Sequence, residues 1–202
     1  MKIVAVGSTL YDLEIGCLGT LSQYAKSGHE VNLIISGSMS NLKEDKVNIG
    51  KEFYHDLGMM NIFFTKGFDY SAVTQDNVNK LSSIMGPINP SVAILPFGKT
   101  LNMKRKILAE SSLLASRGVE NILLYEIEKN KNFSPDVYFR TRNMISLKNT
   151  LVKAHGKSST TAKRIEKNFK KLRQLYSRYL NANQYIEAFE SHKILLLNTV
   201  EF

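Results

Sequence analysis

The segment AVGSTLYDLEIGCLGTL, residues 5–21, carries the chain from a short apolar run into a helical pattern. The run KIVAV at 2–6 is rich in β-branched residues, which is typical of a buried strand. After it, Ile15, Leu18 and Leu21 recur at spacings of three, which favours a helix that buries one face. This stretch therefore predicts the first strand and first helix of a β-α-β unit.

Strand and helix patterns continue to alternate along the first two thirds of the chain. Gly28, after Ser27, is a helix stop, and VNLII at 31–35 predicts the second strand. Alternation of this kind indicates an α/β fold, a Rossmann-like three-layer sandwich with a mainly parallel sheet, which we expect to form a single domain over 1–202. Further strands are predicted at 61–65, 91–95, 121–127, 136–141 and 193–197, and helices at about 46–57, 74–85 and 104–118.

Composition sets limits on the class of protein. With 202 residues, 43% of them hydrophobic, the chain is long enough for one domain with a substantial core. No apolar run reaches the length of a membrane span, and the N-terminus lacks the pattern of a signal peptide, so we expect a soluble cytoplasmic protein. A single cysteine, Cys17, excludes an internal disulfide and a multi-cysteine zinc site, and we expect it to be a small buried residue.

Positive charge is concentrated in the second half of the chain. Residues 1–90 carry 7 Lys and Arg against 9 Asp and Glu, whereas residues 91–202 carry 20 against 9. Such asymmetry indicates either an anionic partner or a solvated basic face. Part of the excess lies in a predicted amphipathic helix at about 158–180, whose apolar stripe favours docking on the domain surface. That stripe consists of Ile165, Phe169, Leu172, Tyr176 and Tyr179.

Several short motifs, in the expected order, resemble the PIG-L/LmbE family of N-acetylglucosaminyl deacetylases. EIGCLGTL at 14–21 is similar to the end of the family's first motif, Ala-His-Pro-Asp-Asp-Glu-x-Leu-Gly-Cys-Gly-Gly-Thr-Leu. Asp69 lies where the family often has an aspartate after the third strand. The resemblance extends over nearly the whole chain and implies an LmbE/PIG-L-like fold. The other matching stretches are YAKSGHEVNLIISG at 24–37, GKEFYHDLGMMNIFF at 50–64, FSPDVYF at 133–139, LVKAHGKSS at 151–159 and YIEAFE at 185–190.

The resemblance also implies which positions hold zinc in this family, and most of those residues are missing. Thr9 falls at the first histidine ligand, Tyr11 at the aspartate base and Asp12 at the second ligand. The segment 101–104, LNMK, replaces the downstream His-Pro-Asp-His motif, so that Lys104 falls at its last ligand. Only Asp12 is retained. A threonine hydroxyl binds zinc poorly, and a neutral phenol such as Tyr11 is no general base near pH 7. We therefore expect no metal ligands and no cofactor.

Two hypotheses concern what replaces the metal. An ammonium at Lys104 would reach the vacated position and pair with Asp12; the alternative is that Lys104 opens a basic helix and points to solvent. Among the four histidines, His155 is the one that the resemblance places near the site, where it would contact a ligand; the alternative is a polar residue at a helix end. The expected ligand-binding residues are Asp12, Glu14, Lys104 and His155, with Asp12 as the one residue retained from the catalytic motif.

Three functions follow, in decreasing order of support. The first is a non-catalytic or impaired PIG-L/LmbE homologue that binds an amino-sugar or sugar-phosphate ligand, with a possible protein partner in glycan metabolism. The second is an active deacetylase with a relocated metal or with metal-free chemistry by Asp12, Glu14 and His155. The third is nucleic-acid binding through the basic helix, which is disfavoured because its aromatic residues have core-facing spacing.

Overall fold

Alternation within the strands gives the sheet two covered faces. In β1 (Lys2–Gly7), Ile3 and Ala5 join one apolar cluster while Val4 and Val6 join the other. This follows from the strand repeat, in which successive side chains point to opposite faces. All four side chains are fully buried, so β1 is packed on both sides, as a central strand of a parallel sheet requires.

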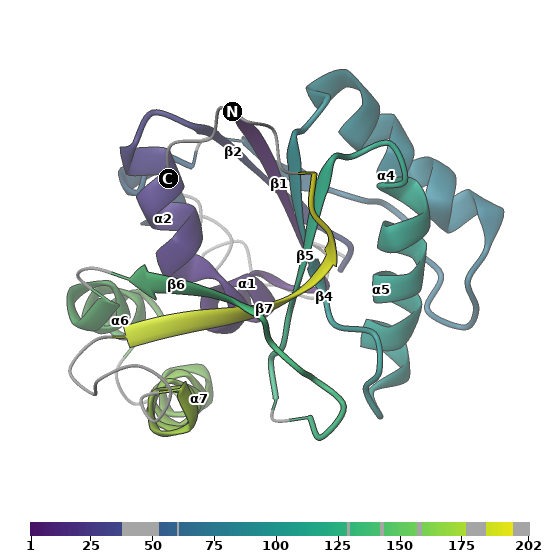
Figure 1. Cartoon of the computed structure of the whole chain (residues 1–202). Helices are drawn as coiled ribbons and strands as arrows, with labels where there is room; N and C mark the ends of the chain where they lie inside the picture. Colours follow the sequence, from purple (N-terminus) through teal and green to yellow (C-terminus); the bar gives the residue numbers. More distant parts are fainter. Residues whose placement is uncertain are drawn as a thin grey trace.

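The computed structural model describes residues 1–37, 53–59, 61–128, 130–141, 144–156, 159–176 and 185–195. Within these ranges seven strands form one sheet in the order β3-β2-β1-β4-β5-β7-β6 (Figure 1). Strands β1 to β5 are parallel, and β7 runs antiparallel to both of its neighbours. After β1 the strands are β2 (Glu30–Ile35), β3 (Asn61–Phe64), β4 (Val92–Pro96), β5 (Asn121–Tyr125), β6 (Val137–Thr141) and β7 (Tyr185–Lys193).

Helices cover both faces of the sheet, which confirms the predicted three-layer α/β sandwich (Figure 1). One face carries α4 (Gln75–Ile88) and α5 (Met103–Ala115). The other carries α1 (Leu10–Gly16), α2 (Leu18–Lys26), α6 (Met144–Ala154) and α7 (Thr160–Tyr176). No helix in the described ranges is both long and apolar enough to cross a membrane.

The predicted first helix is in fact two helices that break at Cys17. The Cys17 backbone, at φ −155° and ψ 12°, leaves the helical region, so the prediction of one continuous helix is wrong. Glycines on either side permit close packing: a Cβ on Gly16 would overlap the ring of Tyr125, and one on Gly19 would meet Thr141. These glycines therefore let α1 and α2 lie directly against β5 and β6. Cys17 itself is fully buried and unpaired, as expected.

Two other boundaries differ from the prediction. The strand predicted at 193–197 is wrong for residues 194–195, because β7 ends at Lys193 and both Ile194 and Leu195 are exposed. Residues 196–197 lie outside the described residues. The apolar composition of KILLL at 193–197 favours a strand, but pairing with β5 and β6 selects the less apolar stretch before it. Helix α4 does not stop before Pro87 but continues to Ile88, and ends at Asn89 with φ 49°.

Other predicted helices are only partly described. The segment 46–52 of the expected helix at 46–57 lies outside the described residues, and 53–56 are helical. Helix α7 lies within the predicted range 158–180, of which 158 and 177–180 lie outside the described residues. Its Ile165 and Phe169 are buried, as the apolar stripe predicts. Helix α6 was not predicted as an element from the sequence.

Candidate functional site

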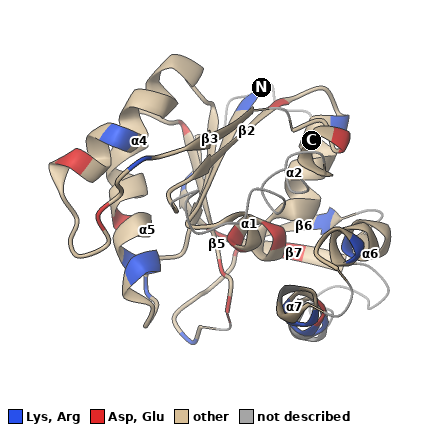
Figure 2. Cartoon of the chain, turned by 180° about the vertical axis from the view of Figure 1, so that it is seen from behind, with Lys and Arg blue, Asp and Glu red and all other residues tan. Residues whose placement is uncertain are grey.

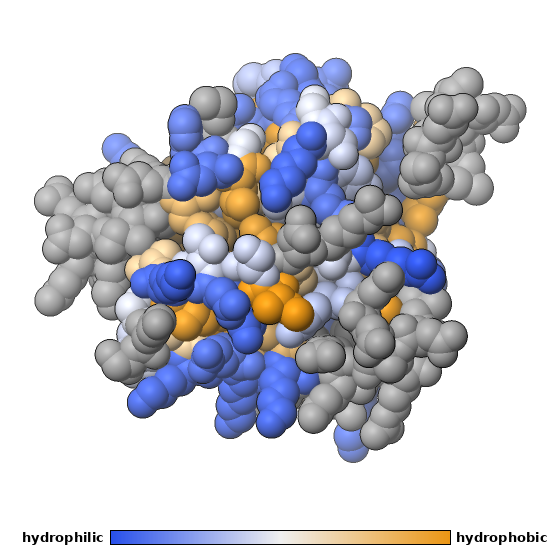
Figure 3. All heavy atoms as spheres, turned by 90° about the vertical axis from the view of Figure 1, so that its left-hand side faces the viewer, coloured by the Kyte–Doolittle hydropathy of each residue, from blue (hydrophilic) through white to orange (hydrophobic). Residues whose placement is uncertain are grey.

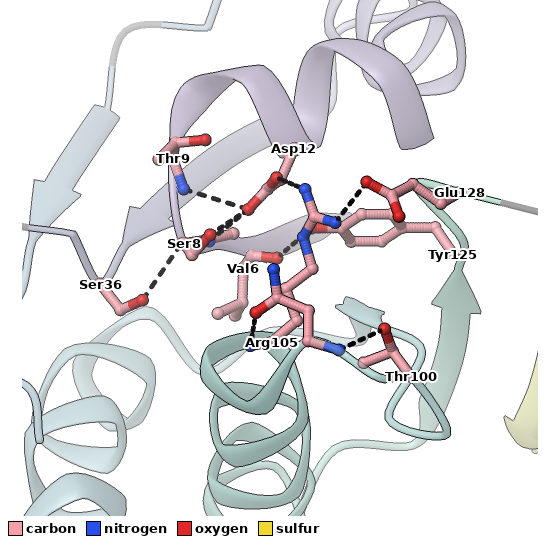
Figure 4. Close-up of polar contacts among 11 residues, drawn as sticks. Val6, Ser8, Thr9, Asp12, Ser36, Thr100, Arg105, Tyr125 and Glu128 are labelled. Carbon is pink, nitrogen blue, oxygen red and sulfur yellow. Dashed lines mark hydrogen bonds and ion pairs between the residues drawn. The ribbon is translucent and has the colours of Figure 1, made fainter. Parts of the chain in front are cut away.

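Asp12 lies where the first β-α connection leaves the sheet (Figure 4). After β1, Thr9 is the N-cap of α1 and Asp12 is the third residue of that helix. One carboxylate oxygen, Oδ2, accepts hydrogen bonds from the backbone N–H groups of Ser8, at 3.0 Å, and Thr9, at 3.3 Å. It also accepts from the Ser8 hydroxyl. Asp12 therefore holds the turn at the helix start, which is the part an acidic residue plays in a capping box.

The second oxygen of Asp12 is bound by an arginine from another helix (Figure 4). Asn102 caps α5 at the carboxyl end of β4, and Arg105 lies in the first turn of that helix. Its Nη2 is 3.1 Å from Asp12 Oδ1, and its Nη1 is 3.2 Å from Oε1 of Glu128, which follows β5. Asp12 is only 2% exposed, so this is a largely buried ion pair.

Electrostatics keep the Arg105 guanidinium charged. Burial alone would lower the pKa of Arg105, but the Asp12 carboxylate, assisted by Glu128, outweighs burial and raises that pKa. Tyr125 lies beneath the pair, and its hydroxyl donates to the carbonyl oxygen of Val6 at 2.8 Å. A fixed positive charge, balanced by carboxylates, therefore lies where β1, β4 and β5 end.

The predicted pairing of Lys104 with Asp12 is wrong, because the next residue, Arg105, binds Asp12 instead. Lys104 is exposed, and its ammonium lies 5.6 Å from the centre of the Tyr70 ring. Consecutive helix residues point about 100° apart, so only one of Lys104 and Arg105 can face β1. Helix α5 packs on the sheet through its buried Ile107 and Leu108, and in this orientation Arg105 reaches Asp12. The alternative, in which Lys104 points to solvent, describes the exposed Lys104, and the cation that meets Asp12 is Arg105.

Tyr11, which the resemblance aligns with a general base, is held as a neutral phenol. Burial raises the pKa of Tyr11, and the nearby arginines Arg164 and Arg105 only partly offset this. The Arg164 guanidinium lies 4.7 Å from the centre of the Tyr11 ring, in a cation–π contact that ties α7 to α1. Thr9 serves as the N-cap of α1. Neither residue is placed as an acid or a base.

Glu14 and His155 form a second, separate cluster. His155 Nε2 is 3.1 Å from Glu14 Oε1, and the Tyr54 hydroxyl donates to the same oxygen at 3.3 Å. Glu14 is buried, and the His155 side chain is 28% exposed. Two residues along a helix turn the side chain by about 200°, so Asp12 and Glu14 face opposite ways. Figure 2 shows the acidic positions of α1 between α5 on one side and α6 and α7 on the other. The structure does not bring all four expected ligand-binding residues together.

Glu187 is a buried acid that the sequence analysis did not single out. It accepts hydrogen bonds from the backbone N–H groups of Gly19, at 2.8 Å, and Thr20, at 2.7 Å, at the start of α2. Burial raises the pKa of Glu187 from its ordinary value of 4.5 to about 7, although these hydrogen bonds oppose the shift. Glu187 lies within YIEAFE, between the apolar residues Ile186 and Ala188. Because successive strand residues point to opposite faces, this pattern alone does not reveal that Glu187 points inward.

The groups around Asp12 do not fit zinc. A zinc site needs three or more protein ligands, usually His, Cys or carboxylates. Within the described ranges no group of three such side chains is arranged to hold a metal. Both oxygens of Asp12 already have partners, and the Arg105 guanidinium lies where a cation would approach Oδ1. The hollow beside Arg105 has a volume of about 20 Å³, about enough for one water molecule.

Comparison with known proteins identifies the fold. No family model and no curated protein sequence matches the chain. The solved structure of the conserved protein TT1542 from Thermus thermophilus is 19% identical, with a TM-score of 0.80 and 99% of each chain covered. GalB, the 4-carboxy-2-hydroxymuconate hydratase from Pseudomonas putida, is 12% identical, with a TM-score of 0.75 and 99% coverage of each.

A third structure carries the likeness to deacetylases. The N,N'-diacetylchitobiose deacetylase from Pyrococcus horikoshii is 14% identical, with a TM-score of 0.74, over 94% of this chain and 83% of that one. The chain therefore has the PIG-L/LmbE-type deacetylase fold, which confirms the resemblance at the level of structure. One structure of this fold is named as a hydratase, so the fold does not fix the reaction.

Proposed function

We propose that this chain is a non-catalytic relative of the zinc-dependent N-acetylglucosaminyl deacetylases, in which an arginine replaces the metal. The observation that carries the proposal is the Arg105 to Asp12 ion pair, at 3.1 Å. Asp12 is the one residue retained at a zinc-ligand position of the resemblance, and its partner is a permanent cation. A guanidinium balances the carboxylate charge, but unlike a metal it has no coordination position in which to bind water and lower its pKa.

The proposed ligand is an amino-sugar or a sugar phosphate. Support comes from the fold, which is shared with a protein named as a chitobiose deacetylase, and from the basic second half of the chain. A phosphate group would gain charge-assisted hydrogen bonds from such a surface. Binding without turnover is also compatible with a role beside a protein partner in glycan metabolism, the partner class expected from the sequence.

A metal-free deacetylase is the second candidate, and the Glu14–His155 contact is the observation that favours it. A histidine held by a buried carboxylate is a common general base. However, Asp12 faces the other way along α1 and is bound by Arg105. This candidate therefore has one acid-base pair without the support of Asp12. Acetate release from N-acetylglucosamine conjugates that is lost in His155→Gln would support it.

Nucleic-acid binding through α7 has less support. Ile165 and Phe169 of that helix are buried, so the described part of its apolar stripe is not available to stack on bases. Tyr176 and Tyr179 lie where no side chain is described.

Zinc content tests the main proposal. The protein is expressed with zinc in the medium, and zinc per chain is measured by plasma mass spectrometry, beside Asp12→Ala as the matched control. We expect far less than one zinc per chain in both proteins, and no change in melting temperature when a chelator is added.

About one zinc per chain in the wild type, lost in Asp12→Ala, would overturn the proposal. Zinc that persists in Asp12→Ala would place a metal elsewhere and would favour the active enzyme with a relocated site. In either case, deacetylation of N-acetylglucosamine conjugates becomes the next assay.

A further inference from the structure

A large groove lies away from Asp12, between α2, β6 and α6. Its volume is about 1240 Å³, compared with about 20 Å³ for the hollow beside Arg105. Figure 3 views the molecule from the side of α2 and α6, where hydrophilic side chains surround a smaller hydrophobic area. Small-molecule sites commonly occupy about 300–1,000 Å³, so a ligand with several rings or groups fits within this space.

The charges that line the groove are all positive. Lys26 comes from the last turn of α2, Arg140 from the end of β6 and Lys153 from the last turn of α6. Among the described residues that line the groove there is no Asp or Glu. In the part of the chain that the structure describes, no ion pair involves these three cations. Three cations without a balancing acid make a local positive potential that favours an anion.

The positive potential comes from side chains and not from backbone amides. Both α2 and α6 present their last turns near these cations, and a helix C-terminus carries carbonyl oxygens with partial negative charge. An anion in the groove would therefore depend on Lys26, Arg140 and Lys153 themselves. Neutralising them should remove most of the attraction.

The rest of the groove suits a polar ligand with an apolar side. Gln23, Asn149 and Thr150 supply amide and hydroxyl groups, and Tyr185 supplies an aromatic surface. The Gln23 amide donates to the Arg140 carbonyl oxygen at 2.8 Å, which joins α2 to β6 and fixes the spacing of the two walls. A hydroxyl-rich ring beside a phosphate matches this combination of groups.

We infer that this groove binds the phosphoryl group of a phosphate-bearing ligand through Lys26, Arg140 and Lys153, with the sugar of a sugar phosphate against the polar wall. The inference rests on the proposed function for the sugar class of the ligand, but the location and the phosphoryl specificity rest on the groove alone. The ligand would thus lie away from Asp12 and Arg105, neither of which lines the groove.

The test measures binding by isothermal titration calorimetry with three probes: inorganic pyrophosphate, glucosamine 6-phosphate and N-acetylglucosamine. The groove variant is Arg140→Gln with Lys153→Gln. Its matched control is Lys163→Gln with Lys167→Gln, which removes the same charge from exposed positions of α7. We expect the groove variant to weaken binding of both phosphate compounds about tenfold or more, and the control less than about twofold.

Circular dichroism and melting temperature verify that both variants fold. Pyrophosphate binding that depends on the groove without glucosamine 6-phosphate binding would support the phosphoryl site and count against the sugar class. Equal loss in the groove variant and its control would overturn the inference, because it would indicate only a general charge effect. Binding of N-acetylglucosamine without either phosphate compound would also overturn it while leaving the proposed function in place.

Discussion

Asp12 and Glu187 are two buried carboxylates that accept backbone hydrogen bonds at the starts of neighbouring helices, but they differ in whether a cation is bound to them. Asp12 accepts from the backbone N–H groups of Ser8 and Thr9 at the start of α1. Glu187 accepts from those of Gly19 and Thr20 at the start of α2. Only Asp12 has an arginine, Arg105, against its other oxygen.

This difference shows that a helix start does not itself need a guanidinium. Backbone amides alone hold Glu187, at the cost of a pKa raised by burial to about 7. Of these two carboxylates, the one with a full cation is Asp12, which the sequence resemblance aligns with a zinc ligand. The comparison therefore supports the proposal that Arg105 replaces the charge of a metal, because the capping of α1 by Asp12 does not itself require a cation.

Removing the Arg105 charge should have the largest effect. Arg105→Met leaves Asp12 buried without its cation, which costs about 3–5 kcal/mol when one partner of a buried pair is lost. Urea unfolding of Arg105→Met, Asp12→Asn and the double variant measures the coupling. We expect the double variant to be clearly more stable than the sum of the two single losses implies.

Glu128→Gln is the control for this cycle, because Glu128 binds the same guanidinium but is 68% exposed at its side chain. Its loss should cost less than about 1 kcal/mol. If Arg105→Met costs no more than Glu128→Gln, the buried pair is not the feature that distinguishes the Asp12 region.

Glu187 should give a pH-dependent effect. The folded chain holds this proton more tightly than the unfolded chain, because burial raises the Glu187 pKa from 4.5 to about 7. Folding therefore takes up a proton between these pH values, and stability falls as pH rises through that window, by roughly 3 kcal/mol at most. Glu187→Gln should remove this part of the pH dependence of the unfolding free energy.

The measurement is urea unfolding of both proteins at pH 4.5, 6 and 8. Glu120→Gln, at an exposed surface position, is the charge-matched control and should keep the wild-type slope. A wild type and a Glu187→Gln variant with parallel pH profiles would show that the two backbone N–H groups fully stabilise the anion, and the contrast with Asp12 would then disappear.

Lys104 should give the smallest effect. Its ammonium is exposed over the ring of Tyr70, so Lys104→Gln should change the unfolding free energy by less than about 0.5 kcal/mol. Thermal unfolding beside Arg105→Met measures the contrast between these adjacent residues. A large loss in Lys104→Gln would mean that both cations, and not Arg105 alone, balance the Asp12 region.

Local patterns were sufficient for the parallel part of the fold. The strands β1 to β5 are short β-branched runs with helical periods between them, and such patterns depend only on nearby residues. The last strand was misplaced because KILLL is more apolar than YIEAFE, and only pairing with β5 and β6 selects the second. The break at Cys17 was also missed, because it depends on contacts of Gly16 and Gly19 with distant strands.

Through the resemblance, the sequence by itself predicts that zinc-ligand positions are lost and that Asp12 is retained, since residue identity fixes which atoms can bind a metal. It could not determine which cation meets Asp12. Lys104 and Arg105 are adjacent in sequence, and the packing of α5 on the sheet through Ile107 and Leu108 decides which one turns inward. It also could not reveal the groove, because Lys26, Arg140 and Lys153 come together only when α2, β6 and α6 pack. Charge identity is local information, whereas the distance between charges is a property of the tertiary structure.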